Sequence, residues 1–306
     1  MDSATTAPVG GAARLPADTR LGRVRLRVGD LERSLRFYRD VLGFRVARDE
    51  GSRVALETSA PAGAEESVVG PELIVLEERP GIRRRPPRPV TTGLYHVALL
   101  LPNRAELGRA FLGLRAADYP LRGMADHAVS ESLYLDDPDG NGLEIYADRP
   151  RASWPIRDGV VQMTVDPMDL AGVVAAAQPV PGPWRVPGQT VVGHLHFTVS
   201  NLERSVRFYR DVIGFDLMMR VPSLVAVSAG GYHHHVNLNT WAGDGAPADS
   251  EEVAGLAGWE LQVAGSDARR ALIDRLGRAG FLAADGIAGD PDAIALQFSS
   301  AAAETH

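Results

Sequence analysis

Two short stretches in opposite halves of the chain alternate apolar with polar residues, at 23–28 and at 194–199. A period of two is typical of a strand with one buried face. A nearly identical segment follows each stretch, LERSLRFYRDVLGF at 31–44 and LERSVRFYRDVIGF at 202–215, with 12 of 14 positions the same. Its apolar residues recur at every third or fourth position, which predicts an amphipathic helix. Both halves of the chain therefore open on the same strand–helix unit.

Residues that favour helix boundaries flank both copies. Asp30 and Asn201 stand directly before them, where a short polar side chain accepts a hydrogen bond from the first turn. Gly43 and Gly214 stand at their ends, where glycine commonly stops a helix. The pattern thus predicts where each helix begins and ends.

A second and fainter repeat follows each of these units. Apolar strands predicted from Gly93 and Gly255 lead into helices that begin near Asn103 and Ser266. Each repeat then finishes on an Asp-Pro-Asp turn and an apolar strand. Four strand–helix–three-strand modules therefore follow one another, starting near residues 21, 92, 191 and 254.

The repeats divide the 306 residues into two domains of ordinary size. A segment rich in proline separates them. The expected organisation is a flexible tail over 1–20, a first domain over 21–147, a linker over 148–190, a second domain over 191–299 and a short tail over 300–306.

Composition narrows the range of functions. The net charge of −7 argues against a nucleic-acid surface. No apolar run reaches membrane-spanning length, and residues 1–18 lack the apolar core of a signal peptide. Because the chain has no cysteine, any metal ligands must come from His, Asp, Glu or Tyr. We expect a cytoplasmic protein that binds a small molecule and neither a membrane nor a nucleic acid.

Histidine and glutamate interrupt several of the apolar strands, where a polar side chain is costly unless it has a partner. His96 and Glu144 each stand inside a run of apolar residues. In the strand that begins at His194, alternation places His194 and His196 on the face opposite the apolar residues. These side chains are candidates for a shared site.

The run 232–238 carries three consecutive histidines. Strand alternation there puts His234 on the core side together with Val236. The same rule turns His233 and His235 toward the cavity.

Structural interpretations compete with these functional ones. A lone buried histidine is more often a hydrogen-bonded core residue than a ligand, and Glu144 could instead pair with Arg23 or Arg25. We expect His196 and His234 to support neighbouring side chains rather than to bind a ligand themselves.

The run from His127 to Glu144 has a specific spacing. After the histidine come an apolar residue and Tyr134, then Pro138 and Gly140 in one turn, and then the glutamate. This run resembles the signature of the type I extradiol ring-cleavage dioxygenases in the vicinal oxygen chelate (glyoxalase/bleomycin resistance/extradiol dioxygenase) superfamily. Ala125 is a small departure from that signature. The resemblance implies an α+β fold of four βαβββ modules, with curled mixed sheets around a cavity and helices outside.

The resemblance also implies a metal centre. The family takes one histidine from the first strand of one module, and a histidine and a glutamate from the first and last strands of another. The equivalent positions here are Arg23, His96, Glu144, His194, Gly258 and Gln297. Only modules two and three together supply a full set, namely His96, Glu144 and His194. We therefore expect a composite site, with module two paired against module three and module one against module four. The alternative is that each half pairs internally and that Arg23 or another group replaces the missing histidine.

Two imidazoles and one carboxylate suit non-haem Fe(II), with Mn(II) as the next candidate. The resemblance implies an enzyme that inserts O2 into a catechol-type aromatic diol, and a homo-oligomer is one option for its assembly. His127 would contact a substrate oxygen, and Tyr134 would be a phenol donor. His233 or His235 could act as an acid–base group or steer the oxygen.

Two other functions stay open at this point. The same scaffold could carry a glyoxalase-like isomerisation or a thiol transfer. It could also form a metal-free binding protein of the bleomycin-resistance kind, which would not need His96, His194 and Glu144 together.

Overall fold

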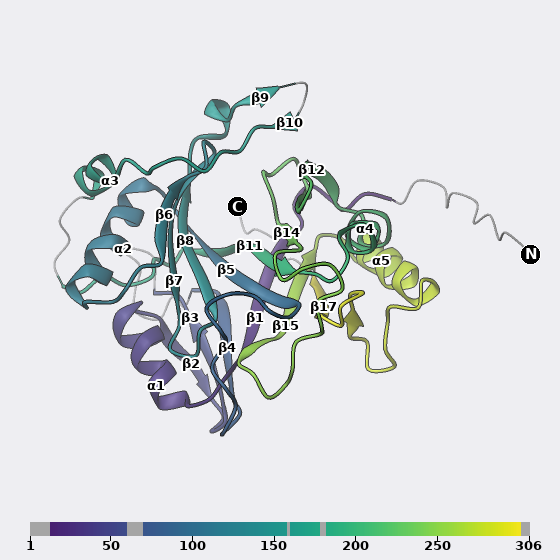
Figure 1. Ribbon diagram of the computed structural model, residues 1–306, viewed down its shortest axis with the longest axis horizontal. Helices are drawn as coiled ribbons and strands as arrows, with labels where there is room; N and C mark the ends of the chain where they lie inside the picture. The colour runs from purple at the N-terminus through teal and green to yellow at the C-terminus, as the bar shows by residue number, and fades with distance from the viewer. Residues whose placement is uncertain (1–12, 60–69, 158–159, 178–181, 301–306) are drawn as a thin grey trace, which may run out of the picture.

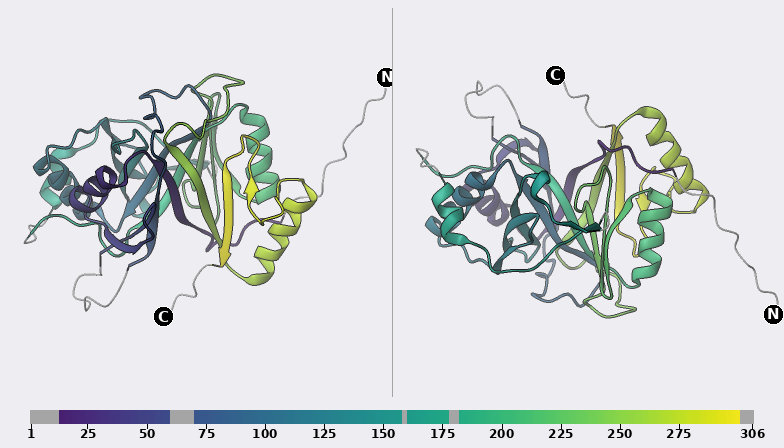
Figure 2. Two further views of the ribbon diagram at one scale, coloured as in Figure 1. Left: turned by 90° about the horizontal axis from the view of Figure 1, so that it is seen from below. Right: turned by 90° about the horizontal axis from the view of Figure 1, so that it is seen from above.

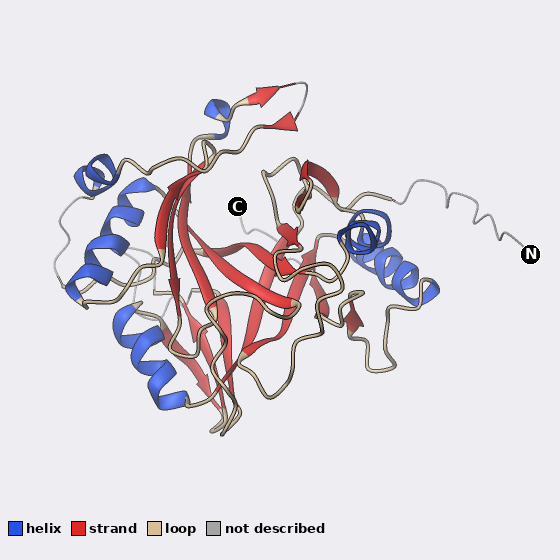
Figure 3. Ribbon diagram, in the orientation of Figure 1, coloured by secondary structure: helices blue, strands red, loops and turns tan. Residues whose placement is uncertain are grey.

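The computed structural model describes residues 13–59, 70–157, 160–177 and 182–300. Within these ranges the chain forms two large sheets with helices on their outer sides (Figures 1 and 3). The described residues leave out positions 1–12 of the tail expected over 1–20 and positions 301–306 of the tail expected over 300–306. They also leave out positions 158–159 and 178–181 of the expected linker. None of the described helices is long and apolar enough to cross a membrane.

One sheet combines strands from modules one and four. Across it the order is β16 (Ala288–Gly289), β17 (Ala295–Ser300), β15 (Gly255–Val263), β1 (Arg20–Val28), β4 (Glu72–Glu78), β3 (Arg53–Glu57) and β2 (Arg45–Asp49). The antiparallel pair of β1 and β15 joins the two modules.

The other sheet combines strands from modules two and three. Across it the order is β12 (Asp216–Val221), β13 (Leu224–Ser228), β14 (Val236–Asn239), β11 (Val191–Thr198), β5 (Gly93–Leu101), β8 (Gly142–Asp148), β7 (Ser130–Asp136) and β6 (Gly123–Asp126). The antiparallel pair of β11 and β5 is the seam of this sheet. The expected pairing of module two with three, and of module one with four, is therefore confirmed.

The helices cover the outer sides of the sheets. They are α1 (Leu31–Leu35) with its extension η1 (Arg36–Val41), α2 (Arg104–Ala116), α4 (Leu202–Val206) with its extension η3 (Arg207–Ile213), and α5 (Ser266–Arg278). Figure 2 shows the purple and teal helices of the first two modules on one side and the green and yellow helices of the last two on the other. The predicted architecture of curled mixed sheets with outer helices is confirmed.

The repeated segment begins and ends as predicted, with left-handed Gly43 and Gly214 at its ends, but its second part is not a regular α-helix. Asp30 Oδ1 accepts the N–H of Arg33 at 2.8 Å, and Asn201 Oδ1 accepts that of Arg204 at 2.9 Å. Both helices then widen into the π-helical turns η1 and η3. Apolar spacing does not distinguish such a turn from a regular helix, because it moves the inward-facing positions by only about one residue.

The two modules within each half of the chain, one with two and three with four, pack together without sharing a sheet. Tyr38 donates to Asp137 Oδ2 at 3.1 Å, and Tyr209 donates to Asp290 Oδ2 at 3.1 Å. Burial raises the pKa of Asp137 to about 6 and that of Asp290 to about 7. In each half, a tyrosine on the first helix is thus hydrogen-bonded to the turn that precedes the last strand of that half.

Two segments outside the four modules are built into the fold. Leu15 is buried, and its N–H donates to the carbonyl of Gly214 at 3.0 Å. The segment between the halves carries the short helix η2 (Arg151–Ser153), the hairpin of β9 (Ile156–Arg157) and β10 (Val160–Val161), and the helix α3 (Leu170–Ala176). Figure 1 shows this hairpin projecting beyond β6 and β8.

Candidate functional site

Three adjacent strands bring His96, Glu144 and His194 together. The strand β5 lies between β11 and β8. Its Ala98 is paired with His194 on one side and with Glu144 on the other, and His96 lies two residues earlier on the same face. The small methyl group of Ala98 leaves the space between the three larger side chains open.

The donor atoms of these side chains converge. Nε2 of His96 and Nε2 of His194 each lie 3.0 Å from Oε2 of Glu144, and the two nitrogens are 3.3 Å apart. All three side chains are buried. Ligands about 2.1 Å from an ion and at right angles to each other are about 3 Å apart. The three residues could therefore hold a metal ion from one side and leave its other side open.

The protonation states also fit a metal ion, since ligands must be deprotonated to bind one. Burial lowers the pKa of His194 to about 4, with only partial compensation from Glu144. Burial alone would raise the pKa of Glu144, but His194 and His96 hold it well below its usual range. A neutral imidazole and an ionised carboxylate are thus in place.

Local sequence features position Glu144. A Cβ atom at Gly142 would lie 2.1 Å from the carbonyl oxygen of Tyr95, so β8 can approach β5 this closely only with glycine there. In the turn before β8, Asp137 Oδ1 accepts the N–H groups of Asp139 at 2.9 Å and Asn141 at 2.8 Å. The Asp-Pro-Asp-Gly turn therefore fixes the start of the strand that carries the carboxylate.

His127 and Tyr134 lie beside these donors, in mutual contact. Tyr134 is opposite Glu144 in the pairing of β7 with β8. His127 donates through Nδ1 to the carbonyl of Thr164 at 2.7 Å, so its Nε2 is an acceptor, 2.6 Å from the hydroxyl of Tyr134. Burial and the charge of Glu144 raise the pKa of Tyr134 well above its ordinary value. The phenol therefore keeps its proton.

A cavity of about 410 Å³ opens in front of these groups. His96, Glu144, His194, His127 and Tyr134 line its polar part. The apolar part of its wall comes from Met163, Val165, Met219, Leu224 and Trp241. These wall residues carry no signal in the sequence, because two of them belong to the expected linker and the others stand at no distinctive spacing.

His196 lines the cavity next to His96. The two residues are paired across β11 and β5, and their ring centroids are 4.8 Å apart. Asn239 donates from Nδ2 to Nε2 of His196 at 2.8 Å. Burial lowers the pKa of His196 well below its usual range. This neutral ring packs against His96 from the side.

The histidines at 233–235 are arranged differently from the prediction. His234 lines the cavity, with its ring centroid 4.1 Å from that of His194. The strand β14 begins only at Val236, and a turn with left-handed glycines at Gly230 and Gly231 precedes it. Strand alternation does not apply to such a turn. The expected placement of His233 and His235 in the cavity, with His234 in the core, is therefore wrong.

His233 and His235 make contacts away from the cavity wall. Nδ1 of His235 accepts the N–H of Ala229 at 3.2 Å and lies 2.7 Å from Oγ of Ser228. Burial lowers the pKa of His235 to about 3. Nε2 of His233 lies 2.8 Å from Oδ1 of Asp148. The position of His235 gives no support to a catalytic role. His233 contacts His234, which lines the cavity.

The equivalent positions of the other sheet hold ion pairs. Arg23 lies 2.9 Å from Glu72 and 3.3 Å from Glu260. A Cβ atom at Gly258 would lie 2.5 Å from the guanidinium of Arg25, so arginine fills the space that a histidine would need there. The alternative in which Arg23 completes the metal site is wrong, since Arg23 belongs to the other sheet.

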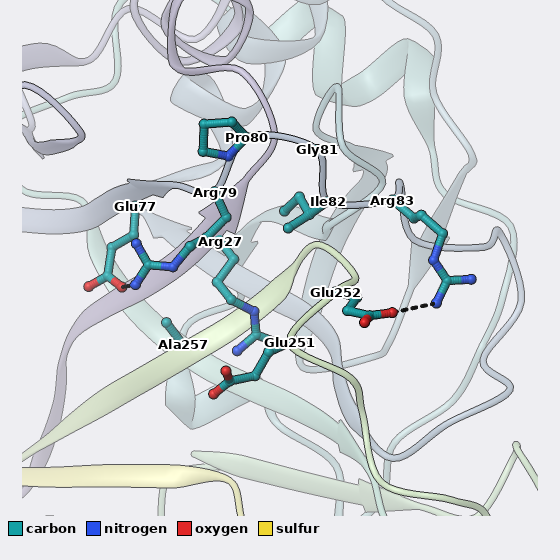
Figure 4. Close-up of a pocket in the computed structure, with 10 residues that line it drawn as sticks. All are labelled: Arg27, Glu77, Arg79, Pro80, Gly81, Ile82, Arg83, Glu251, Glu252 and Ala257. Atoms are coloured by element: carbon teal, nitrogen blue, oxygen red, sulfur yellow. Dashed lines mark ion pairs between the residues drawn. The ribbon is translucent and has the colours of Figure 1, made fainter.

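A second cavity of about 680 Å³ lies between modules one and four (Figure 4). Opposite charges line it, with an ion pair of 4.0 Å between Arg83 and Glu252. Its charged residues are Arg27, Arg79, Arg83, Glu77, Glu251 and Glu252. None of the described residues that line it is a histidine, so it does not repeat the donor set of the first cavity.

Comparison with known proteins agrees with this architecture. The family described as the Glyoxalase/Bleomycin resistance protein/Dioxygenase superfamily matches residues 20–145 and 191–293. A catechol-2,3-dioxygenase of Bacillus subtilis is 40% identical over 270 residues, which are 86% of this chain and 90% of that protein. A biphenyl-2,3-diol 1,2-dioxygenase of Rhodococcus globerulus is 32% identical over 129 residues, 42% of this chain and 63% of its own length.

A solved structure shares the fold at low sequence identity. Glyoxalase I from Zea mays has a TM-score of 0.51 and 15% identity, with 92% of each chain covered. The matched segments reach into all four modules, and the match to the catechol-2,3-dioxygenase covers 86% of the chain. The chain therefore belongs to the glyoxalase/bleomycin resistance protein/dioxygenase superfamily.

Proposed function

We propose that the protein is an extradiol dioxygenase that cleaves the ring of a catechol-type diol, with Fe(II) held by His96, Glu144 and His194. The observation that carries this proposal is the convergence of these three donors at a cavity that His127 and Tyr134 also line. The catechol-2,3-dioxygenase relative supports the reaction class. Mn(II) is the second candidate, because the same donors accept it.

A bound iron would supply a Lewis acid that favours loss of a diol proton and a redox centre between the ring and O2. The chain itself supplies hydrogen bonds in a closed space. The hydroxyl of Tyr134 donates to His127, and its oxygen would accept from a diol hydroxyl. The carbonyl of Thr164 holds the His127 ring in place. This pair would orient the diol beside the donors.

His234 takes the role of acid–base or oxygen-steering group that was predicted from the sequence for His233 or His235. Its Nε2 is buried and has no hydrogen-bond partner among the residues that the structure describes. The ring lines the cavity next to His194. An unpaired imidazole nitrogen at this place would contact the diol or the oxygen.

The cavity fits a ring that carries an apolar substituent. Its volume of about 410 Å³ exceeds what an unsubstituted catechol fills, and methionine, leucine, valine and tryptophan form the wall away from the donors. Removing apolar surface from water contributes about 25 cal/mol for each Å². Alkyl or aryl catechols would therefore bind more tightly than catechol.

A panel of diols tests the proposal directly. Protein purified without oxygen and supplied with Fe(II) is expected to consume one O2 per diol and to form a yellow ring-opened product. With 18O2, both labelled atoms should appear in that product. A substituted catechol should have a KM about tenfold lower than catechol, which corresponds to about 1.4 kcal/mol. Conversion of a hemithioacetal without O2 consumption would instead favour the glyoxalase-like reaction, and binding without turnover of any diol would favour the metal-free binding protein.

The His127 and Tyr134 pair yields a second expected result. Tyr134→Phe and His127→Ala should keep the metal content but lower kcat by on the order of 10² or more, as loss of a positioned acid, base or donor does. Metal analysis and steady-state kinetics on the same samples check this. Tyr119→Phe is a matched control, because its hydroxyl donates to the carbonyl of Asp136 at 2.7 Å and Tyr119 does not belong to the residues that line the cavity. Unchanged rates in the two site variants would mean that the pair only supports the turn.

A further inference from the structure

Three side chains form a continuous hydrogen-bonded chain that ends at the cavity. Oδ1 of Asp148 lies 2.8 Å from Nε2 of His233, and Nδ1 of His233 lies 2.7 Å from Nδ1 of His234. His233 and His234 are buried, whereas the side chain of Asp148 is 21% exposed. The far nitrogen of His234, Nε2, is buried and has no hydrogen-bond partner among the described residues, and the residue lines the cavity.

The chemistry of these groups gives the chain a direction. A carboxylate can only accept, so His233 must donate to Asp148 through Nε2–H. With His233 neutral, this N–H is its only one, so its Nδ1 is an acceptor. The hydrogen between the two rings then belongs to Nδ1 of His234. In this state Nε2 of His234 carries no hydrogen and keeps a free lone pair.

We propose that Asp148 and His233 are positioning residues that set the tautomer of His234, so that its bare Nε2 accepts a hydrogen bond from the substrate diol. This inference rests on the proposed function for the identity of the substrate. The tautomer itself does not, since it follows from the two hydrogen bonds and from a neutral His233.

The surroundings of His233 hold this arrangement. Its ring packs on that of Tyr232, with centroids 4.0 Å apart, and on that of Trp154, with centroids 5.0 Å apart. Trp154 donates from Nε1 to the carbonyl of Arg149 at 2.9 Å, so the aromatic wall is itself fixed. The last residue of β8, Asp148, thus provides the acceptor, and Trp154 in the segment after β8 provides a ring that confines His233.

The first test reads the tautomer without reference to activity. Metal-free protein labelled with 15N-histidine is examined by long-range 1H–15N NMR, and His234→Gln identifies the His234 signals by their loss. The wild type should show His234 protonated on Nδ1 only. In Asp148→Asn, the amide can donate to His233 as well as accept, so the chain can reverse and a signal from Nε2–H of His234 should appear. Asp148→Glu, which can only accept, should restore the wild-type pattern.

The second test uses the metal-loaded enzyme. Asp148→Asn should lower kcat by on the order of ten- to a hundredfold, the usual effect of losing a partner behind a site residue, while metal content and the KM for O2 stay unchanged. Asp148→Glu should recover most of the rate, and Asp267→Asn on the exposed face of α5 serves as the control. A wild-type signal from Nε2–H of His234, or no change of tautomer in Asp148→Asn, would overturn the inference. Because the NMR result does not depend on ring cleavage, failure of the tautomer inference can be distinguished from failure of the proposed function.

Discussion

Glu144→Ala is expected to abolish metal binding and ring cleavage together. The carboxylate is the only negative charge among the three donors, and its Oε2 contacts both imidazole nitrogens at 3.0 Å. Without it, two neutral rings remain, and two ligands hold a divalent ion far more weakly than three. A bound metal supplies several kcal/mol of transition-state stabilisation, and each 1.4 kcal/mol is about tenfold in rate. Turnover should therefore fall by on the order of 10³ or more.

The seven-stranded sheet offers a matched control for this variant. Gln297 stands at the position equivalent to Glu144 but lies on the exposed surface of β17. Gln297→Ala should keep full metal content and full activity. Metal content by mass spectrometry and turnover with one diol would be measured for both variants after purification without oxygen. Full metal occupancy in Glu144→Ala would remove this carboxylate from the site and, with it, the proposed iron centre.

The metal donors could be predicted from sequence because they stand on long, regular strands. On β5, β8 and β11, a period of two decides which side chains share a face, and His96, Glu144 and His194 follow it. The repeated segments also showed which module had lost which ligand. The sheet order then followed from the requirement that one site have three donors. Strand alternation and internal repetition were sufficient for this part only together with the ligand pattern that the family resemblance implied.

The other residues in and behind the cavity wall are placed by features of the fold that the spacing of residues in the sequence does not predict. His234 reaches it from a turn with left-handed glycines, where alternation has no meaning. Met163 and Val165 reach it from a segment whose prolines suggested only a linker. Asp148 ends β8 like an ordinary surface residue, and only the fold places it against His233. Contacts between distant segments therefore supply the substrate wall and the partners of the cavity histidines.

Separating the two halves of the chain is expected to destroy both the fold and the metal site. Residues 1–177 contain His96 and Glu144, but His194 lies in the other half. The seams β5–β11 and β1–β15 both join strands from different halves, so either fragment alone would expose one edge in each sheet. Exposed edges of this length favour aggregation. Neither fragment should bind iron tightly or cleave a diol.

Co-expression of residues 1–177 and 178–306 should restore what each fragment lacks. This cut keeps α3 with α2, on which it packs, and leaves the seam strands intact. The co-purified pair should regain metal content and turnover, and His194→Ala in the second fragment should abolish both again. Arg23→Ala in the first fragment is the matched control, because Arg23 stands at the position equivalent to His194 in the other sheet and should leave metal binding unchanged. A folded first fragment that binds iron tightly and cleaves catechol alone would contradict the composite site, because three donors would then have to come from one half.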